Sequence, residues 1–288
     1  MTRRQLIGLI LLTLVWGLNW PVMKLGLREM SPLWFRSTTM AAGAMALAAY
    51  YWRQGIPVLP RGLNQWRSVV VLGLPNVAGW HGLSIIGISY LPAGRAAILG
   101  FTMPVFTVLL AVFFYGQRFT HRLVVAVTAV LLAIVLLLWN ELSALAGSPI
   151  GIAWMQGAAF CWALGTVWME RAKLTIAPET LVIWMLGASS VVLMLIADVL
   201  EPEPHWHLSA AMWGVLLWSA FLNYGASQVI WFALARDLPA STSAMGITAV
   251  PIVSVLSSTL IGEWPSWQDA LAMVCVVIAI SAVLLRRD

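Results

Sequence analysis

The amino-acid sequence predicts an all-α integral membrane protein in which ten transmembrane helices form two inverted five-helix repeats. Three observations support this fold class: 61% of the 288 residues are hydrophobic, only 9% are charged, and apolar stretches recur along the whole chain. A water-soluble domain keeps roughly a quarter of its residues charged. The chain is therefore expected to be solvated by a lipid bilayer.

Ten apolar segments account for the predicted helices. A helix needs about 20 mostly apolar residues to cross the hydrocarbon core. In chain order, the expected spans are residues 6–27, 32–52, 66–88, 93–115, 121–139, 150–170, 179–199, 210–235, 240–261 and 267–285. The basic pair Arg3-Arg4 before the first span is interpreted as flanking an uncleaved anchor rather than as an export signal.

The basic residues predict the orientation of the spans. With ten spans, both termini lie on one side, and all Lys and Arg residues fall on that side except Lys24, Arg28, Arg36 and Arg95. Positive charge accumulates in cytoplasmic loops, so both termini are expected in the cytoplasm, with the protein in a bacterial-type inner membrane. Because these charges lie between apolar runs and form no patch, nucleic acid is not expected as a partner.

The second half of the chain repeats features of the first half at a shift of 147 positions. This shift superposes Leu91-Pro92-Ala93 on Leu238-Pro239-Ala240, Pro104 on Pro251, Asn76 on Asn223 and His81 on Gln228. Five spans are an odd number, so the second copy crosses the membrane in the opposite sense. Inverted repeats of this kind recur in secondary transporters. The predicted units are residues 1–146 and 147–288.

Short motifs in both halves carry a family resemblance. They are Trp16-Gly17-Leu18-Asn19, Leu91-Pro92-Ala93 with Pro104, and Gly116-Gln117, the last two echoed by Leu238-Pro239-Ala240 with Pro251 and by Gly262-Glu263. Together they resemble the EamA-type repeat of the drug/metabolite transporter superfamily, and the Trp-rich pattern is similar to the YddG-type exporters. The resemblance implies a ten-helix fold with a central cavity, and export of amino acids, aromatic ones included, or of toxic organic compounds. Gln117 departs from the pattern, because the family commonly has an acid there.

Polar and aromatic side chains at helical spacing predict the binding site. The stripes comprise Trp16, Asn19 and Trp20 in the first span, Asn76, Trp80, His81 and Ser84 in the third, and Asn223, Tyr224, Ser227, Gln228 and Trp231 in the eighth. Phe101 and Trp162 complete the predicted set. Repeat-equivalent stripes are expected to face each other across a cavity. Amide and imidazole groups bind carboxylate and ammonium groups there, while Trp and Tyr cover an apolar side chain.

Each of these residues also has a plainer interpretation. In a membrane, Asn, Ser and His also frequently join helices through hydrogen bonds. For each of these residues, joining helices and lining a cavity are both open interpretations. His81 is either a proton carrier or a neutral hydrogen-bonding group. The prolines inside the spans, Pro21, Pro104 and Pro251, are interpreted as hinges that shape the cavity, with a static kink as the alternative.

Several functions are not expected. The only lysines, Lys24 and Lys173, do not follow glycine, so no phosphate-binding loop for ATP exists. Cys161 and Cys275 are isolated, and no cofactor or metal is expected. The sequence contains no Gly-x-Ser-x-Gly nucleophile elbow, and an enzyme is not expected. The predicted function is secondary export of amino acids by alternating access. The alternatives are a multidrug or metabolite exporter of the same fold and a passive channel, and the oligomeric state is left open.

Overall fold

The computed structural model describes residues 2–116, 118, 120–143, 149–237 and 240–284, and these residues form helices and no strand. The elements are α1 (Arg3–Gly26), α2 (Pro32–Arg53), α3 (Gly62–Gly73), η1 (Leu74–Gly79), α4 (Trp80–Tyr90), α5 (Ala93–Gly100), α6 (Met103–Tyr115), α7 (His121–Ser143), α8 (Pro149–Arg171), α9 (Pro178–Leu200), α10 (Ala210–Leu217), η2 (Trp218–Ala226), α11 (Ser227–Asp237), α12 (Ala240–Ser258), η3 (Thr259–Ile261) and α13 (Trp267–Leu284). The predicted boundary between residues 146 and 147 lies outside the described part.

Each expected span is mostly helical where the structure describes it, and the fourth is divided into two helices at residues 101–102. Within the described residues, six helices are long and apolar enough to cross a bilayer: Arg3–Gly26, Gly62–Tyr90, Ala93–Tyr115, His121–Trp139, Pro149–Arg171 and Pro178–Leu200. Two shorter apolar helices, Thr248–Ile261 and Trp267–Val283, lie near the end of the chain. The protein is thus a multi-pass, all-helical membrane protein.

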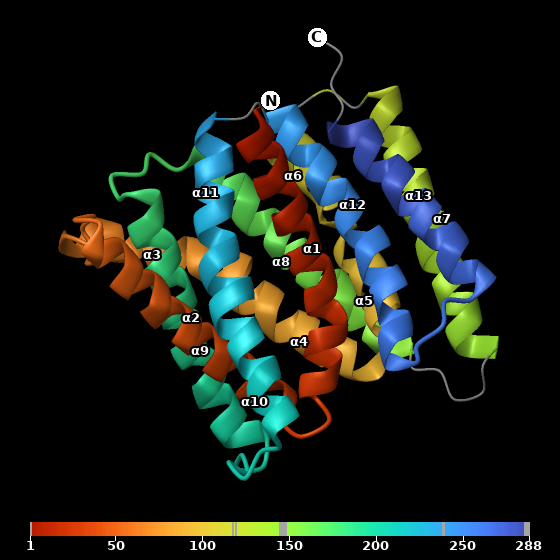
Figure 1. Ribbon diagram of the computed structural model, residues 1–288. Helices are drawn as coiled ribbons and strands as arrows, with labels where there is room; N and C mark the ends of the chain where they lie inside the picture. Colours follow the sequence, from red (N-terminus) through yellow and green to blue (C-terminus); the bar gives the residue numbers. More distant parts are fainter. Residues whose placement is uncertain (1, 117, 119, 144–148, 238–239, 285–288) are drawn as a thin grey trace.

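The helices pair across long stretches of sequence. α1 packs against α12, α2 against α9, α4 against α8, and α7 against α13. In Figure 1, α7 and α13 form one edge of the bundle, and α1 begins at the same end of the bundle at which α13 finishes. The structure therefore interleaves helices from the first and second halves of the chain, so that central side chains come from both.

Two helices contain wide π-helical turns. η1 (Leu74–Gly79) joins α3 to α4, and η2 (Trp218–Ala226) joins α10 to α11. The 147-position shift carries the first segment into the second. A π turn holds more residues than an α turn, so it changes which side chains face a given direction, and such turns are frequent at functional sites.

The fourth expected span is interrupted before Pro104. α5 ends at Gly100 and α6 begins at Met103. The carbonyl oxygen of Leu99 accepts hydrogen bonds from Thr102 Oγ1 (2.7 Å) and from Gln156 Nε2 (3.3 Å), so side chains satisfy the backbone at the break. Pro104 thus lies in the first turn of a new helix, where its missing N–H costs little.

The other two predicted hinges lie elsewhere in their helices. Pro21 lies inside α1 and Pro251 lies inside α12. Both helices continue past the proline. Pro251 is the repeat equivalent of Pro104, so this pair of positions differs in local structure.

Glycine permits close approach where helices from the two halves cross. A Cβ added to Gly17 of α1 would overlap the side chain of Val253 in α12. A Cβ added to Gly43 of α2 would overlap Cβ of Tyr224 in η2. These crossings fit the use of small residues where membrane helices pack tightly.

We expect Gly17→Ala to destabilise the protein by about 1–3 kcal/mol, because the added methyl group overpacks the α1–α12 contact. Gly214→Ala is the matched control, since Gly214 is also helical but has no atom within 4 Å of an added Cβ. The measurement is thermal unfolding of the purified proteins in detergent. Equal melting temperatures for the two variants would contradict the predicted close packing.

Candidate functional site

A cavity of about 220 Å³ lies at the centre of the bundle. Its volume is far above the space that a single bound water requires. Side chains from both halves of the chain line it: Trp16, Asn19, Trp20, Met23, Arg36, Trp80, His81, Ser84, Phe101, Met103, Trp162, Asn223, Tyr224, Gln228 and Trp231. All of the predicted binding residues except Asn76 and Ser227 are in this wall.

Asn76 lies outside the wall because its amide joins two helices. Its Nδ2 donates to the carbonyl oxygen of Trp162 (3.1 Å) and to Oγ1 of Thr166 (3.4 Å) in α8. A Cβ on Gly165 would overlap the backbone of Asn76, so the glycine allows this approach. For Asn76, the helix-joining interpretation describes the observed contacts.

Ser227 also bonds to neighbouring groups instead of facing the cavity. Its hydroxyl donates to the backbone carbonyl of Asn223 and accepts a hydrogen bond from Nε1 of Trp16 (3.1 Å). Ser227 thereby positions the Trp16 ring, which itself lines the cavity. Its role in this structure is to orient a wall residue.

Aromatic rings form much of the cavity wall. The Trp20 ring centroid lies 6.4 Å from that of Trp80, in an edge-to-face arrangement, and 6.5 Å from that of Phe101. The Trp80 and Trp162 centroids are 5.5 Å apart. These spacings are those of mutually supporting aromatic pairs. The rings present a rigid apolar surface to any solute in the cavity.

The same wall also has a polar part, which consists of three side chains in contact with one another. Arg36 Nη1 donates to the Tyr224 hydroxyl (2.6 Å), and this hydroxyl lies 3.2 Å from Nδ1 of His81. A guanidinium group only donates, so the Tyr224 oxygen accepts from Arg36. The hydroxyl thus links the Arg36 guanidinium to the His81 ring.

Arg36, Met23 and Met103 line the cavity but are absent from the predicted set. Arg36 is 2% exposed, although the sequence places it close to the start of its span. Its charge inside an apolar segment is the signal that would have found it, because such residues usually face a cavity or a partner. Met23 shares a helix face with Asn19 and Trp20, so its spacing is a signal that would have found it, whereas Met103 carries no comparable signal.

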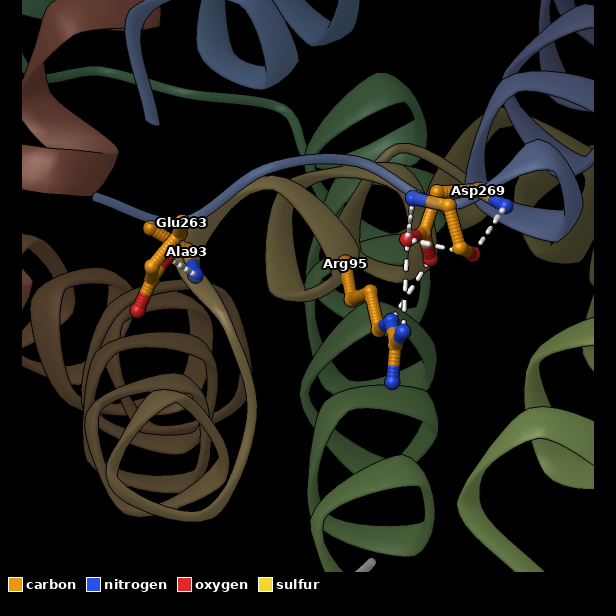
Figure 2. Close-up of polar contacts among 5 residues, drawn as sticks. Ala93, Arg95, Glu263 and Asp269 are labelled. Carbon is orange, nitrogen blue, oxygen red and sulfur yellow. Dashed lines mark hydrogen bonds and ion pairs between the residues drawn. The ribbon is translucent and has the colours of Figure 1, made fainter. Parts of the chain in front are cut away.

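Polar contacts join several helices at the end of the bundle opposite the start of α1. Figure 2 shows the contacts of Ala93, Arg95, Glu263 and Asp269. Glu263 Oε2 accepts a hydrogen bond from the backbone N–H of Ala93 (2.6 Å) at the start of α5. Arg95 contacts Asp269 through Nε–Oδ1 (2.6 Å) and Nη2–Oδ2 (3.2 Å). The Leu91-Pro92-Ala93 motif thus meets the Gly262-Glu263 motif of the other half.

Two further carboxylates cap helices at this end. Glu201 accepts from the backbone N–H groups of Leu33 (2.9 Å) and Trp34 (3.1 Å) at the start of α2. Glu29 accepts from Oγ (2.5 Å) and N (2.9 Å) of Ser209 at the start of α10. The hydrogen bond from the Ser209 hydroxyl, followed by the one from its backbone N–H, holds the pKa of Glu29 below its ordinary value. Negative charge at helix N-termini complements the helix dipole.

Lys24 provides the complementary cap at the end of α4. Its Nζ donates to the backbone carbonyls of Ile88 (2.8 Å) and Leu91 (2.8 Å). A cation at a helix C-terminus is stabilised by the helix dipole. Together with the carboxylate caps, this contact holds one end of the bundle together by charge-assisted hydrogen bonds.

Comparison with known proteins identifies relatives along the whole chain. The EamA-like transporter family matches residues 3–139 and again residues 149–285. The uncharacterized inner membrane transporter YedA of Escherichia coli (strain K12) is 27% identical over 284 residues, which cover 97% of this chain and 90% of the relative. A probable amino-acid metabolite efflux pump of Salmonella typhimurium is 24% identical over 273 residues, 91% of this chain and 89% of that protein. One crystal structure of a protein matches with a TM-score of 0.67 at 20% identity over 96% of both chains, which shows a shared fold.

We expect Tyr224→Phe to lower the free energy of unfolding by about 1–3 kcal/mol, because the buried Arg36 donor loses its hydroxyl acceptor while the ring stays in place. Tyr90→Phe is the control, since Tyr90 is 49% exposed. Chemical denaturation in detergent gives the comparison. A Tyr224→Phe protein as stable as the control would show that the hydroxyl does not support Arg36.

Proposed function

This chain belongs to the EamA-like transporter family, so it is a transporter and not an enzyme, and we propose that it exports amino acids, including aromatic ones, through its central cavity. The observation that carries this proposal is the cavity wall, in which aromatic rings lie beside the Arg36–Tyr224–His81 chain. Aromatic faces cover an apolar or aromatic side chain, and polar groups bind the charged end of an amino acid. The name of the Salmonella relative, an amino-acid metabolite efflux pump, supports the same substrate class.

The proposed architecture has ten membrane crossings in two inverted repeats, residues 1–146 and 147–288. The two matches to the family, at residues 3–139 and 149–285, support this division. Helices that the 147-position shift relates make equivalent contacts. α4 packs on α8, and the corresponding α11 packs on α1. Likewise η1 packs on α9, and the corresponding η2 packs on α2. The distribution of Lys and Arg supports cytoplasmic termini, and the inner-membrane location of YedA supports the same membrane for this chain.

Alternating access is the proposed mechanism. With the termini in the cytoplasm, the joined helix ends face the periplasm, so the contacts Glu263–Ala93 and Arg95–Asp269 close the exit for an exported solute. Export then requires these contacts to separate while the cytoplasmic end closes. Pro21, Pro104 and Pro251 are the proposed hinges, and the break between α5 and α6 beside Pro104 supports a bend at that point.

The energy source is either the solute's own gradient or a proton carried by His81. The observed contacts favour the first, because His81 shares the Tyr224 hydroxyl with the positively charged Arg36 guanidinium. A proton on the imidazole would place two like charges in one wall. The proposed default is facilitated export.

Two alternatives make different demands on the cavity. A multidrug exporter of organic cations would have to bring a positive charge past Arg36, which opposes it. A passive channel needs no contacts that close one end. The cavity and the joined ends both favour an amino-acid carrier.

Counterflow in liposomes tests the proposal. Liposomes loaded with unlabelled amino acid are expected to accumulate labelled tryptophan and phenylalanine, and not cationic drugs or sugars, because a carrier exchanges its own substrate. Exchange of cationic drugs alone would support the multidrug alternative. Downhill uptake without counterflow would support a channel. Repeating the assay at two pH values separates a proton-coupled carrier from a facilitated one.

We expect Asn223→Ala to slow counterflow and Asn76→Ala to leave it nearly unchanged. Asn223 lines the cavity, whereas the Asn76 amide binds α8, so its loss costs stability of about 0.6 kcal/mol. Flux per folded molecule and thermal stability are measured for both variants. Equal loss of flux in the two proteins would contradict this prediction and would show that Asn76 contributes to the substrate site.

A further inference from the structure

Two buried polar groups in the cavity wall lack hydrogen-bond partners. Nε of Arg36 and Oδ1 of Asn19 are both buried and unpaired, and the two residues are 2% and 7% exposed. Both residues line the cavity. Leaving a buried donor or acceptor unpaired costs free energy, so most such groups have a partner. An unpaired donor and an unpaired acceptor, each on a residue that lines this cavity, are the groups that a ligand with both counterparts would pair.

The charge of Arg36 specifies one of these counterparts. Its guanidinium contacts the Tyr224 hydroxyl (2.6 Å) and the Met23 thioether (2.9 Å), and a thioether is a weak acceptor. In the described part of the chain, no acidic side chain forms an ion pair with it. A buried cation without a counter-ion is expensive in a membrane protein, so the missing counterpart is an anion.

The wall is suited to a ligand with one negative charge. Of the cavity-lining residues that the structure describes, Arg36 alone carries a formal charge. The 147-position shift superposes Ile183 on Arg36 in the sequence, so the second half has no equivalent cation at this position. A single carboxylate balances this site, whereas a phosphate dianion would need a second cation.

The positions of the groups along α1 define the rest of the ligand. Arg36 touches Met23, and Asn19 and Trp20 lie about one helical turn earlier on the same face of α1. The donor, the acceptor and the Trp20 ring therefore follow one another within about 6 Å of helix. The Trp80 ring packs edge-to-face on Trp20 and extends the apolar surface.

We infer that this cavity binds the zwitterion of a free α-amino acid, with the carboxylate on Arg36 and the ammonium on Oδ1 of Asn19. The side chain then lies against Trp20 and Trp80. This inference rests on the proposed function and narrows its substrate class. It requires both charged ends, so the cavity rejects amines, carboxylic acids without an amine, and amino-acid amides.

A ligand series on the wild-type protein tests the inference without any mutation. Binding of tryptophan, tryptamine, indole-3-propionate and tryptophan amide is measured by titration calorimetry of the full chain in detergent. Tryptophan is expected to bind at least about tenfold more tightly than each of the others, because each analogue leaves one buried charged hydrogen bond unmade. Equal affinities, or binding of none of the four, would overturn the inference.

Two variants assign the two ends of the zwitterion. Arg36→Met is expected to abolish the preference for tryptophan over tryptamine while keeping the preference over indole-3-propionate. Asn19→Leu is expected to do the reverse. Arg53→Met is the matched control, because Arg53 is an exposed arginine in the same helix. A variant that changes all affinities by one factor would assign its residue a structural role and overturn its part in recognition.

The outcomes separate this inference from the proposed function. Zwitterion selectivity in detergent without counterflow in liposomes supports the site and contradicts amino-acid export. Counterflow of amino acids together with a flat ligand series supports export and contradicts the site. Where Arg36→Met fails to fold, the wild-type series and Asn19→Leu still decide the question.

Discussion

Within a bilayer, a polar group that lacks a protein partner finds no water to replace it, and the contacts of this protein follow from that constraint. Helix ends carry free backbone groups, and here charged side chains bind them: Glu263 at the start of α5, Glu201 at the start of α2 and Lys24 at the end of α4. The same constraint makes the unpaired Nε of Arg36 informative. An interior charge without a counter-ion is costly in a membrane protein, and for this reason Arg36 supports the proposed binding site.

Small residues decide how closely the helices approach, and through this they shape the cavity. Gly43 lets η2 pack against α2, which seats the Tyr224 ring where its hydroxyl reaches Arg36. Gly165 brings α8 against Asn76 in a similar way. Added methyl groups at these crossings would separate the helices that hold the polar chain together. The chemistry of the site thus depends on residues that never touch its contents.

The cavity and the joined helix ends are two parts of one proposed cycle. In this proposal the cavity supplies affinity through its aromatic faces and the Arg36–Tyr224–His81 chain. The contacts Glu263–Ala93 and Arg95–Asp269 hold one end of the two halves together, the end that faces the periplasm in this proposal. A transporter of this design must break charge-assisted bonds each time it releases a solute, so these contacts influence how fast it turns over.

The sequence by itself determined the class of protein and most of the cavity wall. Apolar length and composition predict membrane helices, and helical spacing places Asn223, Gln228 and Trp231 on one face. Tertiary structure alone decided that Asn76 binds α8 and that Arg36 faces the cavity. The physical reason is that periodicity groups residues on a helix face, whereas the partner helix that this face meets is set by packing between distant segments.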